Sequence, residues 1–284
     1  MTERREGRET PSGRGFSTFP VLALAAACAG CGGALPLLHP ARTLAIGDVR
    51  ALAGFSSNIA VGNLSSAVRN AANEAAASQS APNPGNTAYA EGALVAASVG
   101  PGLAPVAGAR VGIGSQAEGG LAYTGRSVRA DIRRSFDLSD TWAFSVGAGG
   151  SAALYGRAQT DALPDVDLGR LHGWGADVPV LVGYQSDGDL YMFWTGLRGG
   201  WEHVNIDDVT SEPGSGQIGP TPISLAATRF WGGGVVGAAV GFRHVHVAME
   251  LDASYASITG DYNGAHAHIA GVTLAPASAL WWRF

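Results

Sequence analysis

The chain has 284 residues, of which only 14% are charged, and a formal net charge of −5. About a quarter of the residues of a soluble domain are usually charged. The negative charge and the lack of a basic stripe argue against nucleic acid as a partner. No apolar run after the N-terminal region approaches the roughly 20 residues of a membrane-spanning helix, so any membrane crossing would have to be made by strands.

Residues 1–30 have the pattern of a secretory signal peptide. Four arginines among the first 15 residues precede the apolar stretch FSTFPVLALAAACAGCGG, which ends in small residues. A basic region, a short apolar core and small residues before the cleavage point are typical of export signals. A single membrane anchor helix is the alternative, but this stretch is too short and too rich in glycine. We therefore expect the protein to be exported through the inner membrane.

The only two cysteines, Cys28 and Cys31, lie at the end of this segment. The pattern resembles the lipobox of bacterial lipoproteins, in which the cysteine after the cleavage point receives lipid. Ala29 and Gly30 fit the positions before a lipidated Cys31, and Cys28 is the alternative, with Ala25 three residues before it. A CxxC redox pair is disfavoured because it would be removed or left in the membrane. The resemblance implies lipoprotein processing enzymes as partners.

The region after the signal divides into a tether over residues 31–45 and a long domain over residues 46–284. Strand-like sequence begins near Gly47. An insert over residues 57–105 is different: SSAVRNAANEAAAS is rich in alanine and predicts a helix of about three turns. SAPNPGN then predicts a break, and AEGALVAAS fits either a short helix or a strand.

The rest of the domain alternates apolar and polar residues with a period of two. In HVHVAMELDASY, Val247 and Leu251 share one face with the other apolar residues, whereas His246, Glu250 and Asp252 share the other. Side chains of a strand alternate between its two faces, so each such segment predicts a strand with one apolar and one polar face. Arg134 breaks the alternation, which indicates a bulge or a position near lipid headgroups.

Loop lengths also alternate along the chain. The turns at 137–140, 186–189 and 241–244 are short, the loops at 156–172 and 205–222 are long, and the one at 258–265 is intermediate. Outer-membrane barrels have short periplasmic turns and longer external loops. With a periplasmic C-terminus, all the short turns fall on the periplasmic side, and the N-terminus lies there too. The segments give about ten strands, within a range of eight to twelve, with the insert on the outer side or folded into the lumen.

The last strand ends with Leu280, Trp282 and Phe284 at alternate positions. This ending resembles the terminal strand signal that bacterial outer-membrane β-barrel proteins present to their assembly machinery. The resemblance implies an all-β fold, a transmembrane antiparallel up-and-down β-barrel in the outer membrane of a Gram-negative envelope. It also implies outer-membrane lipid and the barrel assembly machinery as partners. Many such barrels carry no lipid, so the lipobox makes this chain a lipoprotein variant of the pattern.

The polar faces of the strands would line the lumen of this barrel. Arginines and carboxylates are nearly balanced there, which favours a structural ladder of ion pairs over a selectivity lining for a small solute, because side chains nearly fill a barrel of eight to ten strands. The expected lumen-lining residues are Arg110, Glu118, Arg129, Asp131, Arg133, Asp177, Arg198, Glu202, Arg229, Glu250 and Asp252.

Two histidine pairs, His244 with His246 and His266 with His268, have the spacing of possible metal ligands. Asp261 is near the second pair in the sequence, but structural metal sites normally have four ligands, so no metal is expected. No GxSxG motif or phosphate-binding loop is present. We expect no cofactor and no catalytic residue.

The favoured function is therefore passive: a narrow channel, or a structural or surface-exposed component of the envelope. An outer-membrane enzyme that modifies lipid is one alternative, and its candidate residues are His246 and Ser254. A soluble, lipid-tethered barrel that binds an apolar ligand is the other. That barrel would direct its apolar faces inward and its charged faces outward.

Overall fold

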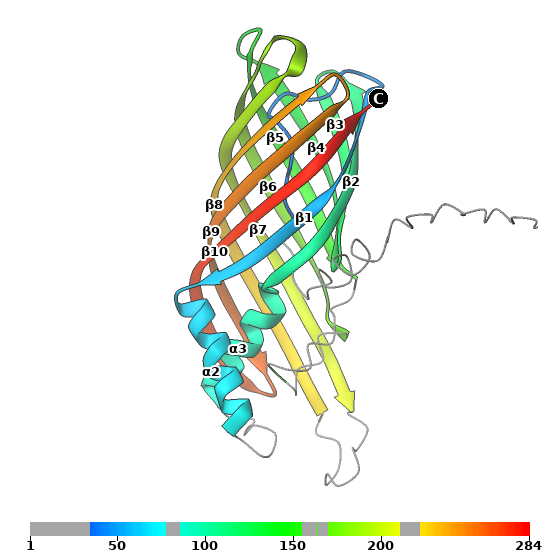
Figure 1. Cartoon of the computed structure of the whole chain (residues 1–284). Coiled ribbons are helices and arrows are strands. Elements are labelled where there is room, and N and C mark those ends of the chain that lie inside the picture. The colour runs from blue at the N-terminus through cyan, green and yellow to red at the C-terminus, as the bar shows by residue number, and fades with distance from the viewer. Residues whose placement is uncertain (1–34, 78–85, 155–162, 164–169, 211–221) are drawn as a thin grey trace, which may run out of the picture.

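The computed structural model describes residues 35–77, 86–154, 163, 170–210 and 222–284 (Figure 1). The predicted signal peptide and both cysteines lie outside these residues. The described chain forms one closed barrel of ten antiparallel strands, each paired with its neighbours in the sequence. The strands are β1 (Val49–Val61), β2 (Gly102–Gly114), β3 (Ala117–Thr124), β4 (Ser127–Asp137), β5 (Trp142–Ala153), β6 (His172–Gln185), β7 (Tyr191–Thr210), β8 (Pro222–Phe242), β9 (Val245–Tyr262) and β10 (Ala265–Arg283).

The first and last strands close the barrel. Leu52 of β1 lies opposite Trp281 of β10, and the backbones of Val49 and Phe284 exchange hydrogen bonds of 3.4 and 2.9 Å. Along the length over which β1 pairs with β10, closure leaves no strand edge with unpaired backbone groups, and only the far ends of β7 and β10 reach beyond their shorter neighbours. The up-and-down barrel of about ten strands expected from the sequence is therefore confirmed.

Four hairpin connections, β2–β3, β4–β5, β6–β7 and β8–β9, are short and lie at the end of the barrel that also holds the C-terminus; we call it the turn end. The opposite end, the helix end, carries the connection through the two helices (Figure 1), as well as the short β3–β4 and β9–β10 turns. The sequence predicted a loop of intermediate length over residues 258–265, and this prediction is wrong. Strand β9 continues to Tyr262, and Asn263 and Gly264 alone form the turn. Both residues have positive φ angles, of 49° and 81°, as a two-residue Asn-Gly hairpin turn requires.

The apolar face of the strands points out of the barrel and the charged face points in. Val178, Val247 and Leu251 are 40–51% exposed, whereas Arg129 and Glu250 are only 1% and 5% exposed. This arrangement is that of a barrel surrounded by lipid, and it is the reverse of a soluble barrel with an apolar interior. Arg134 points outward without a register shift in either pairing of β4, and its guanidinium lies 5.4 Å from the ring centre of Phe136.

The insert between β1 and β2 forms two helices at the helix end: α2 (Asn63–Ala77) and α3 (Thr87–Ser98). The second segment, which the sequence left open, is therefore a helix. Asn86 caps it by accepting hydrogen bonds from the N–H groups of Ala88 and Tyr89. Neither helix of the described chain is long and apolar enough to cross a bilayer.

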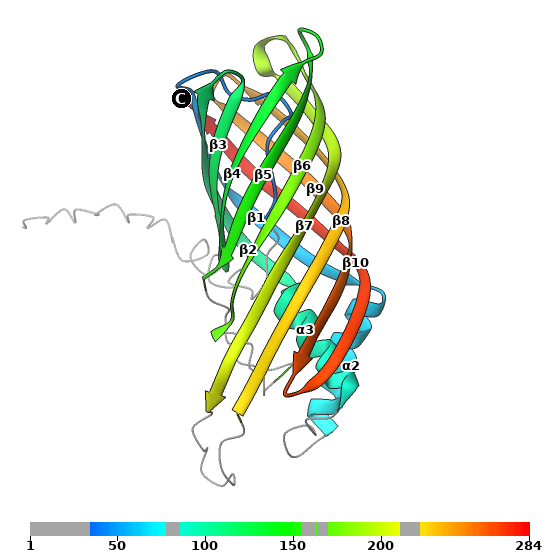
Figure 2. The same ribbon diagram turned by 180° about the vertical axis from the view of Figure 1, so that it is seen from behind.

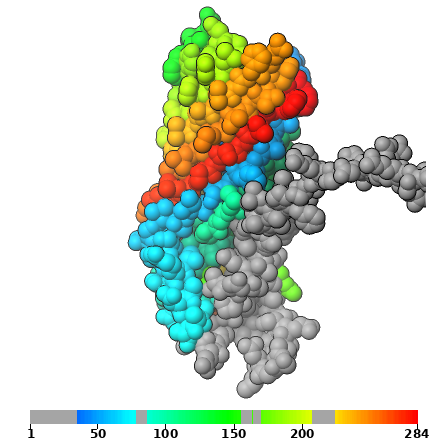
Figure 3. Space-filling view, viewed as in Figure 1, coloured from blue at the N-terminus to red at the C-terminus, as the bar shows by residue number. Residues whose placement is uncertain are grey.

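Helix α3 is buried against the helix-end parts of β7 to β10, which extend beyond the other strands (Figure 2). Its apolar residues share a core with Leu225, Ile258 and Ile269 of those strands, while α2 packs against α3 and lies at the surface (Figure 3). Gly92 lets the two helices approach closely, because a Cβ there would clash with Ala71. The insert therefore forms a second small core that covers the barrel at this end.

Candidate functional site in the barrel lumen

Residues 35–46, which we call the lumen segment, run through the barrel interior from Leu35 to Leu44 and leave it at the exposed Ile46. Leu37, Leu38 and Ala41 are at most 2% exposed. They pack in a core with side chains that point inward from the wall, including Trp194 of β7 and Trp281 of β10. The sequence predicted a tether over residues 31–45, whereas the part that the structure describes fills the lumen. Burying these three apolar side chains is the physical reason for the difference.

Glu250 of β9 holds the middle of the lumen segment. Its two carboxylate oxygens accept hydrogen bonds from the backbone N–H groups of Leu37 and Leu38, at 2.7 and 2.8 Å, and the indole of Trp194 donates a third at 3.0 Å. Leu38 has a positive φ of 48°, which is strained for a leucine. Such a turn of the backbone directs successive N–H groups toward one anion.

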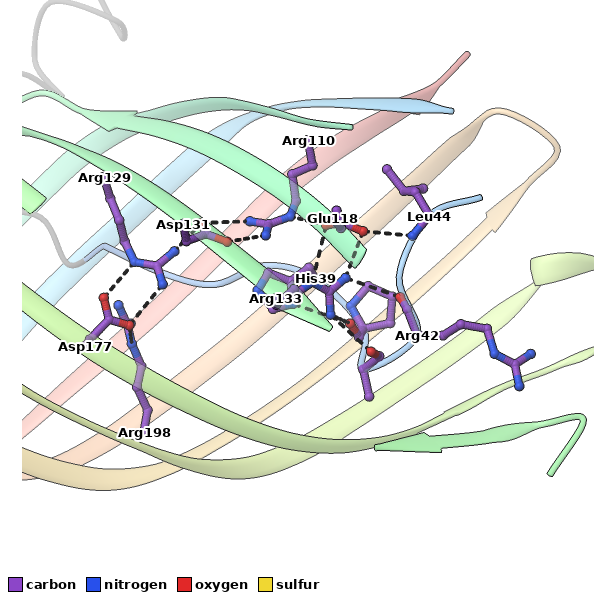
Figure 4. Close-up of polar contacts among 12 residues, drawn as sticks. His39, Arg42, Leu44, Arg110, Glu118, Arg129, Asp131, Arg133, Asp177 and Arg198 are labelled. Atoms are coloured by element: carbon purple, nitrogen blue, oxygen red, sulfur yellow. Dashed lines mark hydrogen bonds and ion pairs between the residues drawn. The ribbon is translucent and has the colours of Figure 1, made fainter. Parts of the chain in front are cut away.

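Arg133 of β4 and Glu118 of β3 hold the next part of the segment (Figure 4). Arg133 donates to the carbonyl oxygens of Pro40, Ala41 and Arg42, at 2.5, 3.1 and 3.2 Å. Glu118 accepts a hydrogen bond of 2.9 Å from the N–H of Leu44 and forms an ion pair of 3.0 Å with Arg133. Both side chains are almost completely buried. The wall thus binds both the donors and the acceptors of this stretch of main chain.

The two ends of the lumen segment fix its direction. Arg198 of β7 donates to the carbonyl of Leu35 at 2.7 Å, deep in the barrel. Arg42 binds the turn between β4 and β5, where it donates to Asp137 and to the carbonyls of Ser139 and Asp140. The chain therefore runs from the interior toward the turn end, where it enters β1.

A continuous ladder of buried ion pairs lies beside the segment (Figure 4). Arg110 pairs with both Glu118 and Asp131, and Asp131 also pairs with Arg129. The ladder continues from Arg129 to Asp177 at 2.8 Å, from Asp177 to Arg198 at 2.9 Å, and from Arg198 to Asp252 at 3.8 Å. Nearer the helix end, Arg229 pairs with Glu202 at 2.7 Å. Buried charges persist only when they are paired in this way.

The structure thus places every charged residue of the expected lumen lining inside the barrel. Most of them pair with one another, while Glu118, Arg133, Arg198 and Glu250 also bind the lumen segment. Glu250 differs from the other carboxylates, because its partners are N–H groups and no ion pair of Glu250 occurs among the described residues.

The inward-pointing residues that the expected lining omitted include Arg50, Trp194 and Trp281. The two indole rings stack with their centres 5.8 Å apart, and Arg50 lies 4.7 Å above Trp281. The alternation of the strands could have placed both tryptophans inside. Trp194 is four residues before Arg198 and so lies on the same, inward face of β7. Trp281 lies between the outward-pointing Leu280 and Trp282 and so points inward from β10.

Two cavities flank the lumen segment. One of about 80 Å³ lies between Leu35 and the end of α3, where it is lined by Asp177, Arg198 and Asp252. At this end, Asn58 of β1 donates to the carbonyl of Val99 at 2.6 Å and binds the residue that follows α3, close to the start of β2. The other, of about 430 Å³, lies at the turn end. The lumen segment therefore separates a cavity at the turn end from a smaller one beside α3.

The histidine pairs do not assemble a metal site. His246 contacts the backbone carbonyl of Asp189, and His266 lies 3.1 Å from Asp261. Within the described ranges, no cluster of three or more potential metal ligands occurs. Ser254 exchanges a hydrogen bond with Thr273 and is eight residues from His246 along β9, which is roughly 26 Å in a strand. The structure does not bring these two candidate catalytic residues together.

The residues expected to form the assembly signal all lie on the outer face of β10 and just after it. Leu280, Trp282 and Phe284 are 57%, 52% and 70% exposed. They belong to the same apolar surface as the other outward-pointing residues. Recognition by an assembly machinery stays a prediction.

No family model and no curated protein sequence matches this chain. Among solved structures, the outer membrane protease OmpT from Escherichia coli is similar, with 10% identity and a TM-score of 0.32, over 85% of this chain and 99% of that one. The Neisserial surface protein A, NspA, has 11% identity and a TM-score of 0.29, over 84% and 96%. The attachment invasion locus protein Ail of Yersinia pestis has 11% identity and a TM-score of 0.21, over 84% and 100%. Likenesses this weak say nothing about activity.

Proposed function

We propose that this protein is a closed β-barrel of a Gram-negative outer membrane and acts as a structural or surface-exposed component of the envelope. The observation that carries the proposal is the lumen segment, which occupies the interior and hydrogen-bonds to the wall through Glu250, Glu118, Arg133 and Arg198. A passive channel needs a continuous path of water. Here the side chains that could line such a path bind the segment and one another.

The outward-pointing apolar residues support the membrane location, and the covered helix end supports the closed state. The alternative of a lipid-modifying enzyme has no support in the geometry, since His246 and Ser254 are not brought together. An inverted soluble barrel would require the opposite orientation of the strand faces. The signal peptide, the lipidated cysteine and the processing and assembly partners remain predictions.

Planar bilayer recording tests the proposal. The purified full-length protein, shown to be folded by heat-modifiable migration on gels, should give no discrete conductance steps. A variant in which residues 37–41 are replaced by a Gly-Ser sequence of equal length should conduct, because the apolar side chains that pack the segment against the wall are removed. Discrete steps from the unaltered protein would refute the closed state. Silence from both would show that the ion-pair ladder alone closes the lumen.

A further inference from the structure

The four charged wall residues that hydrogen-bond to the lumen segment all bind its main-chain atoms. Glu250 and Glu118 accept from the N–H groups of Leu37, Leu38 and Leu44. Arg198 and Arg133 donate to the carbonyls of Leu35 and of residues 40–42. Main-chain groups are common to every peptide, and hydrogen bonding to them is how proteins commonly bind extended peptides.

We propose that the lumen is a peptide-binding site, in which the lumen segment is the resident ligand and which accepts an equivalent peptide in trans. The inference rests on the closed barrel proposed above. The ligand is a non-helical peptide with two adjacent aliphatic residues, a turn of the backbone at the second of them, and an arginine four positions later. In the resident ligand these residues are Leu37, Leu38 and Arg42.

The apolar pair is selected by a pocket in the wall. Leu37 and Leu38 pack among Leu52, Val106, Leu181, Met192 and the two inward tryptophans. Polar or charged side chains at these two positions would be buried without partners. This pocket supplies the sequence preference that the main-chain contacts lack.

The arginine is selected at the turn end. Arg42 donates to Asp137 and to two carbonyls of the β4–β5 turn, at distances of 2.7–3.1 Å. Together with the fixed order of acceptors and donors along the wall, this contact sets the direction of the bound peptide. A reversed peptide would place N–H groups opposite the guanidinium of Arg133, which has only donors.

The hydrogen bonds to Glu250 and Arg133 involve charged groups, which makes them stronger than bonds between neutral groups. Without the two N–H groups of Leu37 and Leu38, the buried carboxylate of Glu250 would keep only the hydrogen bond from the indole of Trp194. We therefore expect a loss of affinity of roughly tenfold or more when these two donors are blocked.

The test uses the full chain with a protease site inserted at Gly47, which lies in an exposed turn between the lumen segment and β1. The folded protein is cleaved, and a fluorescent synthetic peptide with the sequence of residues 35–46 is added. Fluorescence anisotropy should show saturable binding as the peptide exchanges with the cleaved segment, and unlabelled peptide should compete. A scrambled peptide of the same composition should bind at least tenfold more weakly.

A matched pair of modified peptides isolates the main-chain contacts without altering the barrel. N-methylation at Leu37 and Leu38 should weaken binding roughly tenfold or more. N-methylation at Ile46, which is exposed beyond the lumen, should leave affinity unchanged. Equal affinities of the two would overturn the proposal.

Permanent retention of the cleaved segment without exchange would also overturn the proposal, since the segment would then be a fixed part of the fold. Bilayer recordings of the uncleaved protein separate the two hypotheses. Conductance there contradicts the closed barrel. Silence there combined with failure of the labelled peptide to bind contradicts only the peptide site.

Discussion

Glu250 and Leu38 are 212 residues apart in the sequence and share a hydrogen bond of 2.8 Å inside the barrel. The carboxylate belongs to the ninth strand, and the N–H belongs to a segment that precedes the first. The lumen segment therefore cannot reach its final contacts until nearly the whole barrel wall has formed. Its docking couples the two ends of the described chain through the interior.

Replacing this carboxylate should weaken the docking. Glu250→Gln removes the charge and leaves one oxygen for three N–H donors, so we expect the free energy of unfolding to fall by about 2 kcal/mol. The midpoint of urea unfolding in detergent, followed by tryptophan fluorescence, measures the change.

Glu202→Gln is the matched control, because the Glu202 side chain is 23% exposed and has one arginine partner. Its effect should stay below about 1 kcal/mol. Equal losses of unfolding free energy in the two variants would mean that the contacts of Glu250 with the lumen segment add no stability beyond that of a partly exposed ion pair.

The ladder should be most sensitive at Asp177, which joins Arg129 and Arg198 and is 6% exposed. Asp177→Asn leaves two buried guanidinium groups with too little negative charge. We expect a loss of about 3–5 kcal/mol in unfolding free energy.

Asp137→Asn provides the comparison, because Asp137 pairs with Arg42 at the exposed turn end, where the carboxylate is 46% exposed. This pair should contribute at most about 1 kcal/mol. The free energy of unfolding of both variants can be measured with denaturant. A larger loss for Asp137→Asn would contradict the conclusion that the buried ion pairs stabilise the barrel more than the exposed one.

The strand alternation made the barrel predictable from sequence. Each strand has an apolar face toward lipid and a polar face toward the lumen, and a period of two is sufficient to assign both. The charged lining followed from parity alone, as Arg129 and Glu250 show. The same rule would have placed Trp194 inside, but an aromatic residue in a membrane strand is expected to face lipid, and that expectation hid its position.

The lumen segment could not be predicted in the same way. Residues 35–46 have neither strand alternation nor helical periodicity, so they have the sequence character of a linker. Their position depends on contacts with residues far along the chain, such as Leu35 with Arg198 and Leu44 with Glu118. No local pattern encodes such contacts. The turn at Asn263 and Gly264 was different, because its Asn-Gly signal was present in the sequence and was overlooked.

That turn supplies a further prediction. Gly264 has a φ of 81° and no atom within 4 Å of an added Cβ, so Gly264→Ala strains only the backbone. We expect a loss of about 1 kcal/mol. Gly232→Ala, at a position in β8 with equal free space and no positive φ, should change stability by less than half as much. Unfolding midpoints that shift equally would argue against the two-residue turn.

The lipid-facing surface can be tested by placing a charge on it. Leu251 points outward from β9 and is 40% exposed, so Leu251→Arg should destabilise the barrel in lipid vesicles by about 2–4 kcal/mol. Ile46→Arg adds the same charge at an exposed position outside the strands and should have little effect. An unchanged stability of the Leu251→Arg variant would mean that this face contacts water and that the protein does not span a bilayer.

The orientation of the barrel follows from its turns, and cysteine labelling in whole cells can check it. Outer-membrane barrels keep their short turns in the periplasm, so the turn end should face inward and the helices outward. In a variant with both native cysteines replaced by serine, Ala77→Cys on the exposed side of α2 should react with a membrane-impermeant maleimide on intact cells. Ile46→Cys, at the turn end, should react only after the outer membrane is permeabilised. Labelling of Ile46→Cys on intact cells would show that the barrel has the opposite orientation. The lumen segment, which runs toward the turn end, would then lead the chain toward the cell surface and not toward the periplasm.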